Sequence, residues 1–294
     1  MIECPQCRCT LGGAGQACAG CGFVAPMIDG FRVWAPELAR SASGAFFDPA
    51  GFDTLAALED ANFWFQARNE LILWALERYF GAPRRYAEIG CGTGYVLAAV
   101  ERKLAGSELL GSELFVQGLS FAARRCRHAE LVQMDARSMP YRAHFDAMGI
   151  FDVLEHIEED REVLAQIARA LVPGGGLLIT VPQHAWLWSA VDEAACHVRR
   201  YTAAEIEGKV RAAGFEILRS TSFVSLLLPA MYASRWLARK PAAADAGAGA
   251  ELKINPVLNR LFRRVMALEF AMIRRGADLP LGGSRLIVAR RDDR

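Results

Sequence analysis

The chain has 294 residues, which is enough for one large α/β domain or for two domains of average size. Hydrophobic residues make up 53% of the chain, and this excludes a chain that is disordered throughout. The 34 basic and 33 acidic residues nearly cancel, so no overall charge would attract nucleic acid, which is disfavoured as a partner. Residues 252–294 alone hold ten Lys and Arg against four Asp and Glu, so the basic character is concentrated at the C-terminal end.

Two Cys-x-x-Cys pairs lie near the N-terminus, Cys4 with Cys7 and Cys18 with Cys21. Two thiol pairs on tight turns can present four sulfurs to one tetrahedral ion, with bonds of about 2.3 Å. We therefore expect a structural Zn²⁺ ion in a ribbon over residues 1–35, a segment too short to fold around a core of its own. The Ser- and Ala-rich residues 36–52 are expected to connect this ribbon to the rest of the chain.

The sequence also carries hints about the compartment. It begins without a basic and apolar leader, and no apolar run reaches the roughly 20 residues that span a bilayer. Eight cysteines are too few for a disulfide scaffold, and reduced thiols suit a zinc site. We expect a cytoplasmic location, with peripheral contact at the inner face of the membrane as an alternative.

Residues 53–80 carry apolar side chains at helical spacing, which predicts one or two helices. From residue 84 onward, short apolar runs alternate with helical stretches. The predicted strands cover residues 86–89, 108–110, 131–134, 145–151, 176–181, 215–223 and 284–290. The predicted helices between them cover residues 96–104, 117–126 and 161–171. This alternation predicts an α/β fold in which helices cover both faces of a largely parallel sheet.

The last two predicted strands are about sixty residues apart, which we interpret as a helical insertion over residues 225–280. It begins with an apolar helix at 226–238, continues through a low-complexity linker at 241–250 that we expect to be mobile, and ends in an amphipathic helix at 256–275. Arginines flank the apolar positions of that last helix, as in helices that lie on membrane surfaces. A lid or a dimer contact explains the same pattern equally well.

The first strand of the sheet runs into Glu-Ile-Gly-Cys-Gly-Thr-Gly, residues 88–94. Gly90, Gly92 and Gly94 let the backbone turn sharply at the end of the strand, so that a ligand can lie against it. The run is not a dinucleotide fingerprint, because Tyr takes the place of its last Gly and because Glu88 would repel a pyrophosphate. A carboxylate here suits a cationic ligand such as S-adenosylmethionine, so Glu88 is a candidate ligand residue.

Two more acidic residues end the following strands. Glu113 lies 23 residues after Gly90, where a carboxylate accepts both hydroxyls of a ribose. Asp135 ends the third strand, where it can take an adenine amino group. Together with the glycine loop, these acids predict a cofactor that contains a nucleoside.

Residues 60–224 and 284–291 resemble a class I S-adenosylmethionine-dependent methyltransferase. The matching runs are the glycine loop at 88–94, Gly-Ser-Glu at 111–113, Met-Asp-Ala at 134–136, Phe-Asp-Val-Leu-Glu-His-Ile at 151–157 and Leu-Val-Pro-Gly-Gly-Gly-Leu-Leu-Ile at 171–179. The resemblance implies a Rossmann-like, doubly wound sheet of seven strands whose last strand is antiparallel, within a domain over residues 53–294. The cysteine ribbon resembles small zinc ribbons that are attached to methyltransferases.

The resemblance also assigns residues to the cofactor. It implies that Gly90, Gly92, Glu113, Asp135 and Ala136 bind S-adenosylmethionine. It further implies that Ile150 and Phe151 line the methionine side of that cofactor.

Candidate catalytic residues follow the fourth strand. Asp152 and His156 are candidates because carboxyl ends of strands carry the acceptor in this family, and His156 can accept a proton at neutral pH. With Glu155 they resemble the acid-x-x-Glu-His metal site of quinone O-methyltransferases, although Asp replaces the usual first Glu. The alternative is that Glu155 and His156 only begin a helix.

A second group of candidates follows the fifth strand, where the family builds its acceptor pocket. His197 is the better candidate for a catalytic base. Trp186, Arg200 and Tyr201 are candidates for binding the acceptor, with Arg200 placed to hold an acidic group on it. The alternative is a surface loop in which Tyr201 begins the next helix.

The sequence favours an enzyme that methylates oxygen or carbon of a small-molecule or lipid-like acceptor. A second hypothesis is methylation of guanine N1 in ribosomal RNA, because a cysteine ribbon ahead of this fold resembles such enzymes. It is disfavoured because the ribbon has only Arg8 before Arg32 to contact phosphates. A third hypothesis is a non-catalytic scaffold that binds S-adenosylmethionine.

Overall fold

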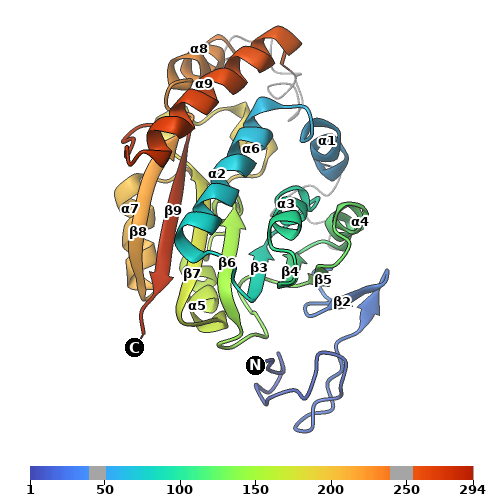
Figure 1. Ribbon diagram of the computed structural model, residues 1–294. Coiled ribbons are helices and arrows are strands. Elements are labelled where there is room, and N and C mark those ends of the chain that lie inside the picture. The colour runs from blue at the N-terminus through green and yellow to red at the C-terminus, as the bar shows by residue number, and fades with distance from the viewer. Residues whose placement is uncertain (40–50, 239–253, 294) are drawn as a thin grey trace.

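The computed structural model describes residues 1–39, 51–238 and 254–293 of the chain (Figure 1). The predicted linker at 241–250 and most of the predicted connector at 36–52 lie outside these residues. No helix within the described ranges is long and apolar enough to cross a membrane.

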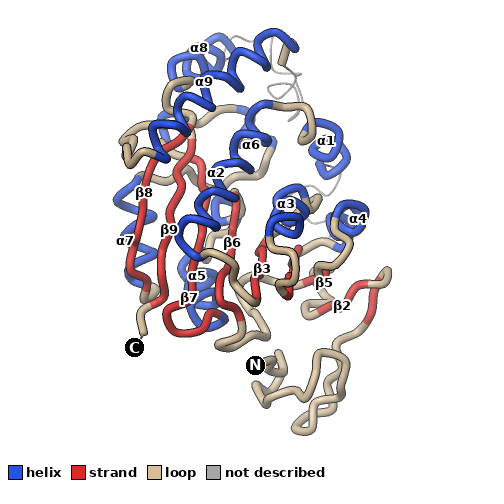
Figure 2. Tube along the Cα trace, in the orientation of Figure 1, coloured by secondary structure: helices blue, strands red, loops and turns tan. Residues whose placement is uncertain are grey.

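One sheet runs through the molecule in the order β1-β2-β5-β4-β3-β6-β7-β9-β8 (Figure 2). The strands are β1 (Met27–Ile28), β2 (Phe31–Val33), β3 (Arg85–Ile89), β4 (Glu108–Glu113), β5 (Glu130–Gln133), β6 (Phe145–Phe151), β7 (Leu171–Pro182), β8 (Phe215–Phe223) and β9 (Ser284–Arg291). Strands β3 to β7 are parallel, whereas β9 lies between β7 and β8 and is antiparallel to both. The predicted α/β fold and its antiparallel last strand are confirmed.

The sheet has nine strands, so the prediction of seven counts two too few. The seven strands β3 to β9 are those expected, and the hairpin of β1 and β2 adds two more at the β5 edge. There Arg32 pairs with Val132 in parallel register, and the backbone N–H of Trp34 donates to the carbonyl of Gln133 at 2.9 Å. Pairing between strands a hundred residues apart leaves no local pattern, so the sequence did not indicate that β2 joins the sheet.

Helices cover both faces of the sheet. The helices are α1 (Gly51–Leu58), α2 (Phe63–Phe80), α3 (Tyr95–Lys103), α4 (Val116–Arg125), α5 (Asp160–Ala170), α6 (Ala190–Ala194), α7 (Ala203–Ala212), α8 (Leu228–Ala238) and α9 (Pro256–Arg274). One apolar core lies between the sheet and α2, α3, α4 and α9, and a second lies between the sheet and α5 and α7. Because strands β3, β6 and β7 are covered on both faces, most of their residues are buried.

The cysteine ribbon packs directly on the second core. Cys4, Leu11, Cys18 and Trp34 are buried in the same cluster as the apolar residues of α5 and α7. The ring of Trp34 meets that of Tyr141 edge-on at 6.4 Å. The ribbon therefore covers an edge and part of a face of the sheet.

The inserted helices α8 and α9 lie beyond the carboxyl ends of the strands, at the end of the molecule opposite the ribbon (Figure 1). Helix α9 packs on α2, where the rings of Phe63 and Phe262 lie 5.3 Å apart. The Asn259 side chain accepts from Phe63 N at 2.8 Å and donates to the Ala61 carbonyl at 2.8 Å. These contacts place the insertion over the carboxyl ends of the strands, where the sequence predicts the candidate catalytic residues.

Candidate functional site

A cavity of about 1190 Å³ lies at the carboxyl ends of β3 to β7. One side is lined by residues predicted to bind the cofactor, including Glu88, Gly90, Gly92, Glu113, Asp135, Ala136 and Phe151. The other side is lined by His197 and by apolar residues of α8 and α9, including Leu227, Met231, Leu258 and Phe262. A cavity for one small ligand usually measures about 300–1,000 Å³, so this one has room for two molecules side by side.

The glycine loop forms the floor of the cavity. Gly90 has φ of +68°, and a Cβ there would collide with the side chain of Val153. Gly92 has φ of +53°, and its N–H donates to Glu113 at 3.0 Å. The loop exposes its backbone to the cavity because the glycines bring no side chain that would fill it.

Glu88 is a buried carboxylate at the edge of this floor. It is 3% exposed, and its Oε2 has no hydrogen-bond partner within the described chain. Burial raises the pKa of Glu88 to about 8, and the charge of Glu59 adds to the rise while that of Arg68 opposes it. A cationic ligand in the cavity would supply the missing partner, so the residue fits the ammonium group of S-adenosylmethionine.

The two acids predicted for the nucleoside end are both in place. The Glu113 carboxylate accepts from the N–H groups of Gly92 and Leu114 at 3.0 and 2.7 Å, which fixes its orientation toward the loop. Burial raises the pKa of Glu113. Asp135 is held in a fork by Arg137, whose guanidinium donates to it at 2.9–3.1 Å. Both carboxylates are thus rigid acceptors on the cavity wall.

Opposite the glycine loop, His197 is paired with Asp192 of α6. His197 Nδ1 lies 2.9 Å from Asp192 Oδ1, and Asp192 is completely buried. The charge of Arg200 and hydrogen bonds from His197 and Arg200 outweigh burial and lower the pKa of Asp192 to about 2. An ionised carboxylate only accepts hydrogen bonds, so Nδ1 carries the proton and Nε2 presents its lone pair.

A family model described as a methyltransferase domain matches residues 59–220, more than half of the chain. The chain belongs to the S-adenosylmethionine-dependent methyltransferase family. A probable S-adenosylmethionine-dependent methyltransferase of Mycolicibacterium smegmatis is 27% identical over 172 residues, which are 57% of this chain and 65% of that protein. The demethylmenaquinone methyltransferase of Thermus thermophilus is 26% identical over 117 residues, covering 38% of this chain and 52% of the relative. The chain therefore spans less than two thirds of the length of these relatives.

The fold is shared with solved methyltransferases. Phosphoethanolamine N-methyltransferase 2 of Haemonchus contortus, in complex with S-adenosyl-L-methionine, superposes with a TM-score of 0.55 at 18% identity. The match covers 92% of this chain and 61% of that one. At this identity the likeness concerns the fold alone.

In this chain, Asp152 does not present a free carboxylate to the cavity. Its Oδ2 accepts from Arg68 of α2 and, at 3.0 Å, from the Thr180 hydroxyl. The guanidinium of Arg68 also stacks on Trp64, with its carbon 4.6 Å from the ring centre. Asp152 thus joins α2 to the end of β6 at the cavity wall, and its catalytic role stays a prediction.

His156 and Glu155 lie beside His197, and burial shifts the pKa of both side chains. Burial and the neighbouring His197 lower the pKa of His156 to about 3, so its imidazole is a weak base. Burial and the Asp152 charge raise the pKa of Glu155 well above its usual range. The ligand atoms of Glu155, His156 and His197 all lie within 4.8 Å of one another, which is close enough to hold a metal ion. Asp152 is not part of this group, so the predicted acid-x-x-Glu-His set is replaced by one that includes His197.

Four predicted site residues do not line the cavity. Ile150 is completely buried in the core, and Gly94 packs against Ala122 of α4, where a Cβ would lie 2.8 Å from the backbone. Tyr201 is completely buried and donates to Asp160 at 2.7 Å. Trp186 is 49% exposed and lies against Tyr232 of α8. Arg200 does line the cavity, but it donates to Asp192 at 2.6 Å and thereby positions that carboxylate.

The sequence did not reveal the contact that closes the cofactor end of the cavity. Glu59, at the junction of α1 and α2, accepts from the Thr93 hydroxyl at 2.8 and 2.7 Å. Arg125 of α4 pairs with the same carboxylate and donates to Thr93 at 2.9 Å. Glu59 lies three residues before Asn62, which begins α2, and nothing in this local sequence indicates the contact with Thr93 and Arg125.

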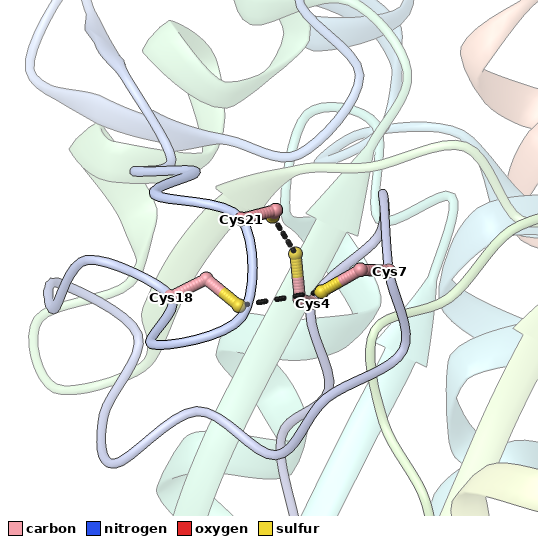
Figure 3. A group of neighbouring side chains, drawn as sticks. All are labelled: Cys4, Cys7, Cys18 and Cys21. Carbon is pink, nitrogen blue, oxygen red and sulfur yellow. Dashed lines mark hydrogen bonds between the residues drawn. The ribbon is translucent and has the colours of Figure 1, made fainter.

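The four ribbon cysteines converge on one point (Figure 3). Their sulfurs all lie within 4.8 Å of one another, with Cys4 and Cys21 3.5 Å apart and Cys7 and Cys18 3.4 Å apart. Tetrahedral bonds of about 2.3 Å to one zinc ion would separate the sulfurs by about 3.8 Å. The two turns are alike, since the N–H of Arg8 donates to the Cys4 carbonyl and that of Gly22 to the Cys18 carbonyl. The donor set and its geometry fit a zinc ion.

Proposed function

We propose that this chain transfers the methyl group of S-adenosylmethionine to oxygen or acidic carbon of a small, lipid-like acceptor. The observation that carries the proposal is the continuity of the cavity, which joins the glycine loop to His197 and to the apolar helices of the insertion. The bound cofactor supplies an electrophilic methyl group on a sulfonium. The chain has to hold the acceptor in line with that methyl group and remove a proton from it.

The cofactor would be held by residues at three places. Glu88 would pair with its ammonium group, the backbone of Gly90 and Gly92 would lie against its middle, and Glu113 and Asp135 would take its ribose and adenine. Glu113 would also orient the loop, because it accepts from Gly92 N. The hydrogen bond between Thr93 and Glu59 and the ion pair between Glu59 and Arg125 would keep α1 and α2 over the bound cofactor.

His197 would be the base. Asp192 keeps the proton on Nδ1, so the Nε2 lone pair, 4.0 Å from Glu155 Oε1, can accept the acceptor's proton. The imidazolium that forms would face the Asp192 carboxylate at 2.9 Å. Arg200 and Ser189 N fix Asp192 from two further sides at 2.6 and 2.9 Å. His156 and Glu155 would shape the wall next to this base.

A metal ion at Glu155, His156 and His197 would occupy the same Nε2, so the two roles exclude each other. We propose the base, since the acceptor side of the cavity is otherwise lined mainly by apolar groups. Treatment with EDTA followed by measurement of methyl transfer distinguishes the roles. Full activity after chelation supports the base. Activity that is lost while the ribbon keeps its zinc, and that returns with added Mg²⁺, supports the metal.

The apolar lining of the acceptor side of the cavity supports a hydrophobic substrate. Leu227, Met231, Leu258 and Phe262 contribute apolar surface there, and such surface favours an acceptor with an aliphatic or prenyl part. RNA methylation is less well supported, because no residue of the ribbon is among the described residues that line the cavity. A cell extract incubated with labelled S-adenosylmethionine should therefore gain label in its lipid or small-molecule fraction, and label confined to RNA would exclude the proposal.

We also propose that Cys4, Cys7, Cys18 and Cys21 bind one structural Zn²⁺ ion. Such an ion would tie the two turns of the ribbon together next to the β5 edge. Metal analysis of the purified protein tests this, and one zinc per chain is the expected result.

A further inference from the structure

The outer face of α9 carries apolar side chains that are exposed to solvent in the part of the chain that the structure describes. Val257, Leu261, Leu268 and Met272 lie on one side of the helix, and we call them the outer α9 face. They are between 38% and 66% exposed. Burying apolar side chains is normally favourable, so a continuous exposed row of them usually marks a surface that meets a partner.

The outer α9 face is not needed to hold the helix in place. Its opposite side, with Met266, Phe270 and Ile273, is buried in the core. Asn259 adds the two hydrogen bonds to the start of α2. The helix is therefore rigidly mounted with its outer side chains turned to solvent.

Arginines flank this apolar row. Arg260, Arg263, Arg264 and Arg274 are all exposed and lie along the adjacent side of α9. The only acidic residue of the helix, Glu269, is completely buried and accepts from Ser225 N and Leu226 N at 2.7 Å. The exposed surface of α9 thus combines apolar and cationic groups without carboxylates of its own, which complements an anionic lipid surface.

A second exposed group lies at the same end of the molecule. Trp186 packs edge-to-face on Tyr232 of α8, with the ring centres 5.8 Å apart. The two side chains are 49% and 50% exposed. Helices α8 and α9 both lie beyond the carboxyl ends of the strands (Figure 1). Trp and Tyr side chains are favoured at the boundary between lipid headgroups and acyl chains, because one end is apolar and the other is polar.

The cavity opens on this same surface. Leu258 of α9 lines the cavity and is also 46% exposed, so it stands at the mouth. Ala230 and Ser234 of α8 line the cavity from the other side and are exposed as well. A molecule leaving a lipid surface on which α8 and α9 rest would meet the cavity entrance directly.

We propose that α8 and the outer α9 face dock on an anionic phospholipid membrane and that the acceptor enters the cavity from that membrane. The acceptor part rests on the proposed methyl transfer, whereas the docking itself does not. The contact would be interfacial, because the side of α9 opposite the outer α9 face is buried in the fold. The apolar side chains of the outer α9 face would enter the acyl region, and the arginines beside them would contact lipid phosphates.

The test is co-sedimentation with vesicles of phosphatidylcholine alone or with 30% phosphatidylglycerol, without cofactor. We expect at least tenfold stronger binding to the anionic vesicles and a marked loss at high salt. The double variant Leu261→Ser/Leu268→Ser should lose at least tenfold in binding, as should Arg260→Gln/Arg264→Gln. The control Val24→Ser changes a side chain of the ribbon that is 49% exposed and should bind like the parent.

Two results would overturn the proposal. One is that the parent protein stays in the supernatant with both kinds of vesicle. The other is that the parent is a dimer and that Leu261→Ser/Leu268→Ser is a folded monomer with unchanged vesicle binding. The outer α9 face would then contact a second copy of the chain. Because turnover is not measured, failure here leaves methyl transfer untouched, and methyl transfer into detergent-dispersed lipid tests that function separately.

Discussion

Asp192 Oδ1 accepts a hydrogen bond from His197 Nδ1 at 2.9 Å and also from Arg200 Nε at 2.6 Å. The carboxylate therefore sets the tautomer and orientation of the imidazole, which is what a proton acceptor in methyl transfer requires. The backbone makes the pairing possible, because Cys196 with φ of +57° turns the chain so that His197 N donates to the Asp192 carbonyl at 2.8 Å.

Asp192→Asn should lower kcat about 10²-fold or more, because the amide no longer fixes the proton on Nδ1. The dissociation constant for S-adenosylmethionine should stay within about twofold of the parent value. Calorimetry and initial rates with labelled cofactor measure the two effects. His128→Gln, at an exposed histidine outside the cavity lining, is the matched control and should leave both unchanged.

Cofactor binding should depend on pH through Glu88. Because burial raises the pKa of its carboxyl to about 8, the free protein holds Glu88 largely protonated at pH 7. A cationic ligand stabilises the ionised form, so binding at pH 7 should release a proton, and affinity should rise with pH up to about 8. Calorimetry in buffers of different ionisation enthalpy detects the proton, and Glu88→Gln should abolish its release.

The same carboxyl affects stability. Its folded pKa lies above the unfolded value, so its contribution to stability is present in full below about 4.5 and is lost as pH rises through about 8. The ligand-free protein should therefore lose stability over this range, and Glu88→Gln should lose less. Denaturant titrations at pH 5 and pH 9 give the free energy of unfolding of each protein. An equal loss of this free energy between the two pH values in the parent and in Glu88→Gln would contradict this account.

The contact of Glu59 with Thr93 and Arg125 should strengthen the binding of S-adenosylmethionine. Arg125→Met leaves the Glu59 carboxylate without its cation, so the first two helices should open more often. We expect roughly tenfold weaker binding of S-adenosylmethionine, or about 1.4 kcal/mol. Lys103→Met breaks an exposed ion pair with Glu77 and should change the affinity by less than twofold.

The ribbon should depend on its metal. Cys18→Ser should remove the bound zinc and lower the melting temperature by several degrees, because the ribbon packs on the sheet core and pairs with β5. Cys9→Ser changes an exposed cysteine outside the group of four and should keep both zinc and stability. A Cys18→Ser protein with a full zinc content would show that the four sulfurs are not the ligands.

Much of the fold could be predicted from the sequence, because each strand carries a local apolar pattern. The ranges 145–151 and 215–223 agree with β6 and β8 to the residue. The acids predicted to bind the cofactor could be located as well. Glu88, Glu113 and Asp135 lie at or just after the carboxyl ends of parallel strands, and all three line the cavity. Strand order thus brings together residues that a local pattern can identify one by one.

The remaining contacts join segments that are far apart in the sequence. Arg68 and Asp152 are 84 residues apart, and Glu59 and Arg125 are 66 apart. Nothing in either neighbourhood indicates the partner, so Asp152 could not be recognised as the anchor of α2. His197 was predicted as a candidate base, yet its pairing with Asp192 depends on a turn at Cys196 that no pattern predicts.

The central claim is that His197 removes a proton from an acceptor held in the apolar half of the cavity. The most direct measurement is the initial rate of label transfer from S-adenosylmethionine into the lipid and small-molecule fractions of a cell extract, for the parent and for His197→Gln. The account predicts transfer by the parent and a loss of about 10²-fold or more in a variant that still binds the cofactor. Equal rates for the two proteins, or label found in RNA alone, would contradict it.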